Sequence, residues 1–558
     1  MESKARFRWW DYPVFLALTA VHLTVLGKIL LPWIVQGTWT RAHPILLVVL
    51  GTILLDFLLW EWRWFALPLM RVPIPKAPPR GLRVGVGVTF VPGPESIEML
   101  EKTVAALVAM EYPHDTWVLD EGDDLAVRRL CQRLGAWHFT RFGISRYQKP
   151  DGRFKSRTKY GNYNAWLEEI GYASYDIVVA FDSDHVPVPD YLKQVLGYFD
   201  DKNVAYVQPA QVYSNQGASF IAGAAAEETY AYYSSIQMTA YSVGYPIIVG
   251  CHNAHRVTAL REIGGFAAHE ADDMVMTLLY RAKGWRGVYV PKVLARGLTP
   301  VSWTAYLGQQ RRWARSVLDF KLRVFPKYAG KLPVLERILT YVHGVYYLRG
   351  PIIGLQLGLL AIMLATASLP RGSGVNLLWS MTTIWASVFL CDVYRQRFFL
   401  DPKTEVGVHW RSTFVSFVKW PYFVLAFWDA IRAQYGVYTL TPKARRASRA
   451  YGFGLTHLVV IGLVSTGWVI DIARGPSSFV VVHIAAAVAV LTSLFAAITS
   501  TWTFPPAFQG AAVRRTAWIE RAVPVPVSIE YPVLADAARL PVRHIEPVPP
   551  AREVRALG

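Results

Sequence analysis

The chain has 558 residues, enough for a soluble domain together with a membrane region. Hydrophobic residues make up 53% of it and charged residues 18%, and the mean hydropathy is +0.24. This composition is too apolar for an ordinary soluble protein and favours segments embedded in a bilayer. The 58 Lys and Arg against 40 Asp and Glu give a net charge of +18. Nucleic-acid binding is one explanation, but no nucleic-acid motif appears, and cytosolic loops beside anionic lipid are the simpler one.

The cysteines give no sign of a crosslinked or metal-bound framework. Cys131, Cys251 and Cys391 lie far apart and form no CxxC pair, so their spacing implies neither disulfides nor a zinc site.

Two apolar runs near the N-terminus, at 14–35 and 45–67, are long enough to span a bilayer. The first lacks a small-residue cleavage site, so we interpret it as an anchor rather than a removed signal. The second contains charged residues, which indicates that its C-terminal end lies at the interface or against protein. A proline-rich link, from Pro73 to Pro79, follows.

Strands and helices alternate in the next part of the chain, from 82 to 322. We predict strands at 82–90, 116–119, 136–141 and 176–181 with helices between them. This alternation is typical of a doubly wound α/β sheet, in which ligands gather at the carboxyl ends of the strands.

Acidic residues follow two of these strands. Asp120 and Glu121 end one, while Asp182 and Asp184 follow another in the order Asp-Ser-Asp-His. Carboxylates at i and i+2 can hold Mg²⁺ together with substrate phosphates, and the ion would then neutralise a diphosphate leaving group. An acidic turn with a side-chain cap explains either motif alone equally well.

Asp272 and Asp273 form a third acidic site, immediately before a predicted helix at 274–283. One carboxylate within hydrogen-bond reach of a sugar hydroxyl can act as a general base. The alternative is a pair that caps the helix N-terminus.

Gln309, Arg312 and Trp313 share one face of a predicted helix. Arginine suits a phosphate because its planar fork offers two donors, and tryptophan offers a flat surface to a sugar ring. The alternative is an amphipathic helix whose arginines face lipid headgroups.

Further apolar runs follow at 350–368, 375–393, 453–470 and 479–500, which brings the predicted spans to six. The run at 413–430 carries Lys419, Pro421 and Asp429, so we predict an interfacial helix there, with a spanning helix as the alternative. Six spans place both termini and the basic clusters at 443–449 and 514–515 on one face, the cytosolic one.

The resulting domain division has four parts. Two N-terminal spans occupy 1–71, the cytosolic domain 72–330, the other spans and interfacial helices 331–502, and a cytosolic tail 503–558.

The order of the motifs resembles the processive family-two membrane glycosyltransferases, with bacterial cellulose synthase the nearest and hyaluronan and chitin synthases as relatives. The motifs are DEG, DSD, ADD and QQRRW between membrane spans. Further stretches are similar, namely KYGNYN at 159–164, FDSDHVP at 181–187 and YTLTPK at 438–443, which resembles a gating loop. Glu121 stands where a second Asp is usual, and Ala271-Asp272 replaces Thr-Glu.

The resemblance implies an A-type nucleotide-sugar transferase fold and roles at the donor. Asp120 would contact the uridine of a UDP-sugar, with Glu121 beside it. Asp182 and Asp184 would hold Mg²⁺ or Mn²⁺ and the diphosphate, and the remaining donor-side residues would be Lys159 and Asp272.

It also implies roles at the acceptor and the gate. Asp273 would be the catalytic base, Arg312 would bind the diphosphate, and Trp313 and Gln309 would line the acceptor end. Thr441 and Lys443 would reach into the site when the gate closes.

The implied enzyme is a multi-pass protein of the cell (inner or plasma) membrane with a cytosolic catalytic domain. It would transfer sugar from a UDP-sugar, with UDP-glucose as the leading candidate, to a growing polysaccharide. It would also export that polymer through the bilayer, together with an accessory export subunit. No nucleic acid is expected as a partner. The alternatives are transfer of a single sugar to a lipid, a polymer of the chitin, hyaluronan or mannan type, and a transporter, against which the ordered acidic motifs argue.

Overall fold

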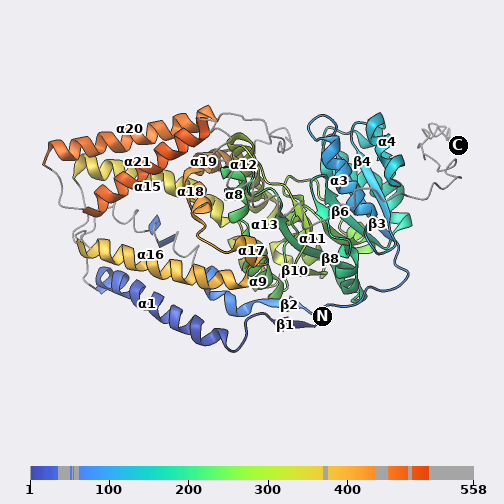
Figure 1. Ribbon diagram of the computed structural model, residues 1–558, viewed down its shortest axis with the longest axis horizontal. Coiled ribbons are helices and arrows are strands. Elements are labelled where there is room, and N and C mark those ends of the chain that lie inside the picture. Colours follow the sequence, from blue (N-terminus) through green and yellow to red (C-terminus); the bar gives the residue numbers. More distant parts are fainter. Residues whose placement is uncertain are drawn as a thin grey trace, which may run out of the picture.

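The computed structural model describes residues 2–35, 51–52, 54–55, 62–367, 375–433, 450–475 and 480–501. Most of the span expected at 45–67, the YTLTPK stretch with Thr441 and Lys443, and the tail lie outside these residues. Figure 1 shows the long helices gathered at one end of the molecule and the sheet at the other.

An eight-stranded sheet forms the centre of the soluble part, in the order β5-β4-β3-β6-β9-β8-β10-β7. The strands are β3 (Val84–Phe90), β4 (Asp115–Asp120), β5 (Trp137–Thr140), β6 (Ile177–Asp182), β7 (Val186–Pro187), β8 (Val204–Tyr213), β9 (Asn253–Arg256) and β10 (Arg286–Gly297). The four strands predicted from the sequence are present and run parallel. The sheet as a whole is mixed, because β9 is antiparallel to both of its neighbours.

Both faces of the sheet are covered. Helices α3 (Ile97–Val108) and α4 (Leu125–Leu134) pack on the face to which Val86 points, whereas α5 (Lys159–Trp166) and α11 (Asp272–Ala282) pack on the other. Alternate residues of a strand point to opposite faces, so the valines of β3 face one layer and its glycines the other. A Cβ on Gly87 would lie 2.9 Å from the Tyr163 ring, which is why the second face has no side chain there.

Helix α12 (Trp303–Asp319) lies between the sheet and the membrane helices (Figure 1). It packs against α19 (Trp420–Ile431) and α8 (Phe220–Glu227). The side chain of Lys419 is buried between them and donates to Glu228, at 2.5 Å, and to Gln310, at 2.9 Å. Because an unpaired buried charge is costly, the pair with Glu228 fixes the end of α8 to the start of α19, and the bond to Gln310 connects α12 to the same point.

Three helical segments among the described residues are long and apolar enough to cross a membrane. They are Val334–Thr366, which ends in α15 (Arg349–Thr366), then α20 (Tyr451–Ala473) and α21 (Val480–Thr501). Helices α1 (Asp11–Val35) and α16 (Val375–Arg395) form where spans were expected but are not among these three. A membrane region is therefore supported, while six spans remain a prediction.

The run expected to form an interfacial helix, at 413–430, is broken. Helix α18 (Trp410–Val418) and α19 meet at Lys419, just before Pro421, with a bend of 49°. The pair is apolar enough to count together as a fourth span or a re-entrant segment. Both alternatives from the sequence, an interfacial and a spanning helix, stay open.

Candidate active site

One cavity, with a volume of about 2820 Å³, extends from the carboxyl ends of the strands past α12 and in among the membrane helices. The sequence-predicted residues that line it are Glu121, Lys159, Asp182, Asp184, Asp272, Asp273, Gln309, Arg312 and Trp313. Residues from α15, α16 and α21, among them Leu357, Trp385 and Val488, line its far part. The three acidic motifs and the α12 face therefore meet in one space.

Asp182 ends β6, and Asp184 lies in the turn before β7. Ser183 between them donates its hydroxyl to Glu95, and all four of these residues line the cavity. Lys159, at the start of α5, donates to Asp182 and to the carbonyl oxygen of Gly250. The backbone N–H of Leu298 donates to Asp184 at 3.3 Å.

This turn has the donor set of a divalent-cation site. Asp182, Asp184 and His185 each offer a ligand atom, and the three atoms lie within 4.8 Å of one another. Carboxylate oxygens suit Mg²⁺ and Mn²⁺. The residues present thus fit the predicted ion, and they do not choose between the two metals.

Glu121 and its neighbour Asp120 have different surroundings. Arg141 binds both carboxylate oxygens of Glu121, at 2.8 and 2.9 Å, and fixes this cavity wall. Asp120 is fully buried and accepts from the backbone of Gly122 at 2.9 Å and Asp124 at 2.6 Å. Since Asp120 is not among the residues that line the cavity, its contact with a uridine remains a prediction.

Asp272 and Asp273 begin α11 and line the cavity as well. The backbone N–H groups of Met274 and Gly250 donate to Asp273, at 2.7 and 3.2 Å, and that of Asp273 donates to Asp272 at 3.0 Å. The expected side-chain cap is not formed, because Ala271 occupies the N-cap position, and the two aspartates accept backbone bonds in the first turn while they face the cavity.

The carboxyl groups of Asp272 and Asp273 both have raised pKa values. Burial, and next the charge of Asp273, raise the pKa of Asp272 to about 7, and burial also raises the pKa of Asp273. A carboxyl group with a raised pKa is a base only above that pKa, whereas an ordinary aspartate, with a pKa of about 4, is a base throughout the neutral range.

With Asp273 as the base, we therefore expect kcat for sugar transfer to begin falling at a pH above about 4, the pKa of an ordinary aspartate, because burial raises the pKa of Asp273. Asp272→Asn removes the neighbouring negative charge and should move this acid limb to lower pH, since interacting carboxyls titrate as a pair. A pH–rate profile of both proteins measures it. An acid limb near pH 4 in the native protein would contradict the shift.

On α12, the cavity is lined by Gln309, Arg312 and Trp313, as their spacing predicted. The Trp313 side chain is 36% exposed, which leaves part of its ring open to the cavity. Arg311 points elsewhere and pairs with Asp429 of α19 at 2.7 Å. Of the two adjacent arginines, Arg312 thus lines the cavity, whereas Arg311 forms an ion pair with α19.

Sequence reasoning missed the loop before β9. Gly250 bonds to Lys159 through its carbonyl and to Asp273 through its N–H, so it joins the donor side to the candidate base. Backbone contacts leave no side-chain signal, and nothing in the pattern could have found them. Glu95 was also missed; it lines the cavity, and burial raises its pKa to about 7.

Residues 88–316 match the family described as glycosyltransferase like family 2. The match covers less than half of the chain and indicates a family 2 glycosyltransferase domain in that segment. This family 2 domain runs from β3 to α12 and so includes all the acidic motifs and the α12 face. The resemblance found in the sequence is confirmed at this level, and the mixed sheet is the centre of an A-type glycosyltransferase fold.

Curated relatives of the family 2 domain are named cellulose synthases. The catalytic subunit of Xanthomonas axonopodis pv. citri is 24% identical over 355 residues, 61% of this chain and 44% of that protein. Cellulose synthase 1 catalytic subunit of Komagataeibacter xylinus is 26% identical over 295 residues, 50% of this chain and 37% of that one. The chain thus spans less than half the length of either relative.

Solved structures resemble the chain more distantly. A mannosyltransferase from Pyrobaculum calidifontis, in complex with GDP-Man and Mn²⁺, is 18% identical and covers 75% of this chain and 100% of its own, with a TM-score of 0.47.

Proposed function

We propose that the protein is a processive, inverting glycosyltransferase that moves sugar from a UDP-sugar onto a growing polysaccharide. UDP-glucose is the leading candidate for the donor. The observation that carries this proposal is the single cavity shared by the carboxylates, the α12 face and the membrane helices. Relatives named as UDP-forming cellulose synthases support the choice of donor.

At the donor, Lys159 and Arg312 provide positive charge toward the diphosphate. Asp182 and Asp184 would hold a Mg²⁺ or Mn²⁺ ion, which supplies further charge to stabilise the leaving group. Electrostatic stabilisation of this kind is usually the largest contribution to catalysis.

At the acceptor, Asp273 takes the proton of the attacking hydroxyl. The hydroxyl oxygen forms the new bond to the anomeric carbon on the face opposite UDP, and the bond from that carbon to the diphosphate oxygen breaks. No covalent enzyme intermediate is needed, so one base suffices and the anomeric configuration inverts.

The far part of the cavity offers a path for the product. Trp313 faces it from α12, and Tyr346, Tyr347 and Trp385 line it between the helices. A sugar chain is too polar to cross hydrocarbon unaided, whereas aromatic faces can lie under successive rings. The catalytic domain then faces the cytosol, where the donor is made, and the helices cross the cell membrane.

A second candidate, transfer of one sugar to a lipid, is favoured by the charge in that far part. Arg63, Arg349 and Arg395 line the cavity there, with Asp392 as an acidic neighbour. The Nε atoms of Arg63 and Arg395 are buried without a hydrogen-bond partner. Such a wall suits an acceptor with an anionic group, such as a lipid phosphate.

Product analysis separates the two candidates. Membranes containing the protein are incubated with radiolabelled UDP-glucose, UDP-N-acetylglucosamine or GDP-mannose, and the products are extracted with organic solvent and run on a gel. We expect a long, solvent-insoluble polymer from UDP-glucose that linkage-specific glucanases digest. Label that enters only the organic phase would replace this proposal with the lipid acceptor, and no transfer from any nucleotide sugar would overturn both.

A further inference from the structure

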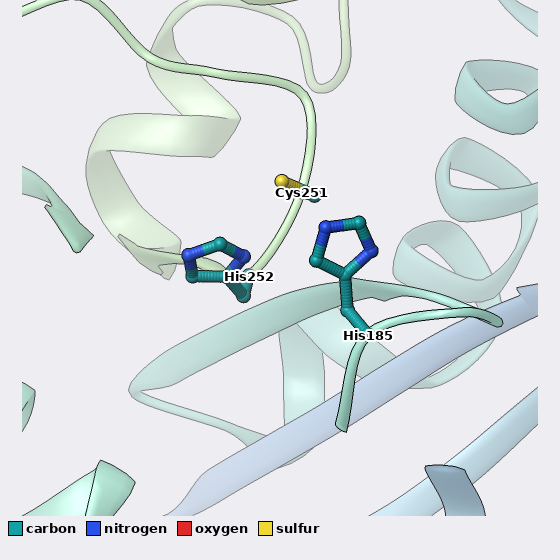
Figure 2. A group of neighbouring side chains, drawn as sticks. All are labelled: His185, Cys251 and His252. Atoms are coloured by element: carbon teal, nitrogen blue, oxygen red, sulfur yellow. The ribbon is translucent and has the colours of Figure 1, made fainter. Parts of the chain in front are cut away.

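A second cluster of metal-ligating side chains lies behind the Asp182–Asp184 turn. It consists of His185, from that turn, and Cys251 and His252, from the loop before β9 (Figure 2). One ligand atom of each lies within 4.8 Å of the other two, and the imidazole centroids are 5.4 Å apart. All three side chains are buried, with exposures of 2%, 3% and 0%.

His252 has one nitrogen with a partner and one without. Its Nε2 donates to the carbonyl oxygen of Ala210 at 3.1 Å, which leaves the lone pair on Nδ1. That Nδ1 is buried and has no hydrogen-bond partner in the structure. Figure 2 shows the ring beside Cys251 and His185, with a nitrogen on the side that faces them. A buried acceptor without a donor is rare in folded proteins, and a bound ion is one of the features that account for it.

His185 also has a lone pair on one nitrogen, although this nitrogen already accepts a hydrogen bond. Its Nδ1–H donates to Asp184 at 3.0 Å, and Gln211 donates to its Nε2 at 3.0 Å. The amide of Gln211 is oriented by Tyr233, whose hydroxyl donates to the Gln211 oxygen at 2.5 Å. Gly297 leaves room at this point, because a Cβ there would lie 2.3 Å from Nε2.

The two histidines therefore have the surroundings of metal ligands. Ligating histidines almost always donate their other N–H to a carboxylate or a backbone carbonyl, and here Asp184 and Ala210 accept those bonds. Cys251 adds a sulfur, the ligand type that selects zinc over magnesium.

We propose that His185 Nε2, Cys251 Sγ and His252 Nδ1 form a binding site for a thiophilic divalent cation such as Zn²⁺, separate from the carboxylate site for the catalytic ion. On binding, the thiol releases its proton to solvent and the Gln211 amide moves off Nε2. His185 and Cys251 also line the cavity, from which a water molecule would supply the fourth ligand that zinc prefers.

Occupation of this site would act on the reaction. His185 belongs to both metal groups, so a zinc ion on one side of its ring fixes the Asp184 carboxylate on the other. Gly250, next to Cys251, contacts Lys159 and Asp273. Zinc is thus expected to inhibit sugar transfer while magnesium supports it, although binding itself does not depend on the proposed reaction.

Cobalt substitution tests the site directly. Full-length protein in nanodiscs is titrated with Co²⁺ in excess Mg²⁺, and we expect a thiolate-to-cobalt charge-transfer band. Cys251→Ser should abolish the band, whereas Cys131→Ser and Cys391→Ser, which change buried cysteines outside the cluster, should keep it. Asp182→Asn should keep it too. No band in the native protein, or an unchanged band in Cys251→Ser, would overturn the site.

Zinc X-ray absorption on the native protein gives a readout that needs no variant. We expect one sulfur at about 2.3 Å and nitrogens at about 2.0–2.1 Å. A shell of oxygen and nitrogen alone would mean that zinc occupies only the carboxylates, and the proposal would fail. His252→Gln should weaken zinc binding by at least about tenfold, because loss of even a supporting residue costs that much.

Discussion

Asp273→Asn is expected to lower the rate of sugar transfer by about 10²–10⁴-fold, the usual contribution of a positioned general base. Asparagine keeps the size of the side chain and an oxygen that can accept from Met274 or Gly250, so the start of α11 should be preserved. It cannot take a proton from the acceptor. Affinity for UDP, measured by calorimetry, should stay near that of the native protein.

The neighbouring carboxylate is the matched control. Asp272→Asn removes an equal charge one residue earlier, from a carboxylate that accepts a backbone bond from Asp273. We expect its kcat at alkaline pH to stay within about tenfold of the native value, compared with the 10²-fold or larger loss for a base. If Asp272→Asn were the inactive variant and Asp273→Asn the active one, the assignment of the base would be reversed.

Arg312→Ala is expected to lower kcat by about 10²–10³-fold, the typical cost of removing one electrostatic contact to a developing negative charge. Arg312 lines the cavity on the same face of α12 as Trp313, where it can reach the diphosphate of a bound donor. Arg312→Lys should recover only part of the loss, since lysine keeps the charge but not the two-pronged geometry. Initial rates of UDP release measure both variants.

Arg311 supplies the control for this prediction. It is the preceding residue and has the same charge, but it pairs with Asp429 on α19. Arg311→Ala should therefore leave kcat within a fewfold of the native value, because a partly exposed ion pair contributes only about 0–1 kcal/mol. Equal losses for the two variants would indicate a general effect of charge on α12 and contradict a specific role for Arg312.

Local patterns predicted the half of the sheet that leads to the turn with Asp182 and Asp184. Asp182 follows a continuous apolar strand, and the carboxyl end of such a strand faces a ligand cavity in an α/β sheet. The same reasoning placed Arg312 and Trp313 on one helix face by their spacing. These predictions succeeded because each depends on neighbours a few residues away.

Features that depend on contacts between residues far apart in the chain could not be predicted from local sequence patterns. The position of β9 as an antiparallel strand is set by its pairing with β6 and β8. The local hydrophobic periodicity of a segment does not reveal which strands it pairs with. Asp120 points into its own loop rather than the cavity, although its position after a strand matches that of Asp182. The cysteine spacing argued against zinc because it considered cysteines alone, whereas Cys251 meets histidines brought together by the fold.

The buried bonds of Lys419 have a mechanical consequence. This residue sits at the bend between α18 and α19 and holds Glu228 and Gln310 at the same time. Gln310 lies within the α12 segment that presents Arg312 and Trp313. Under the proposed function, a force that a moving polymer exerts on the bent pair would therefore reach the α12 residues that line the cavity. Translocation of the polymer and formation of each new glycosidic bond would then be coupled mechanically through α12.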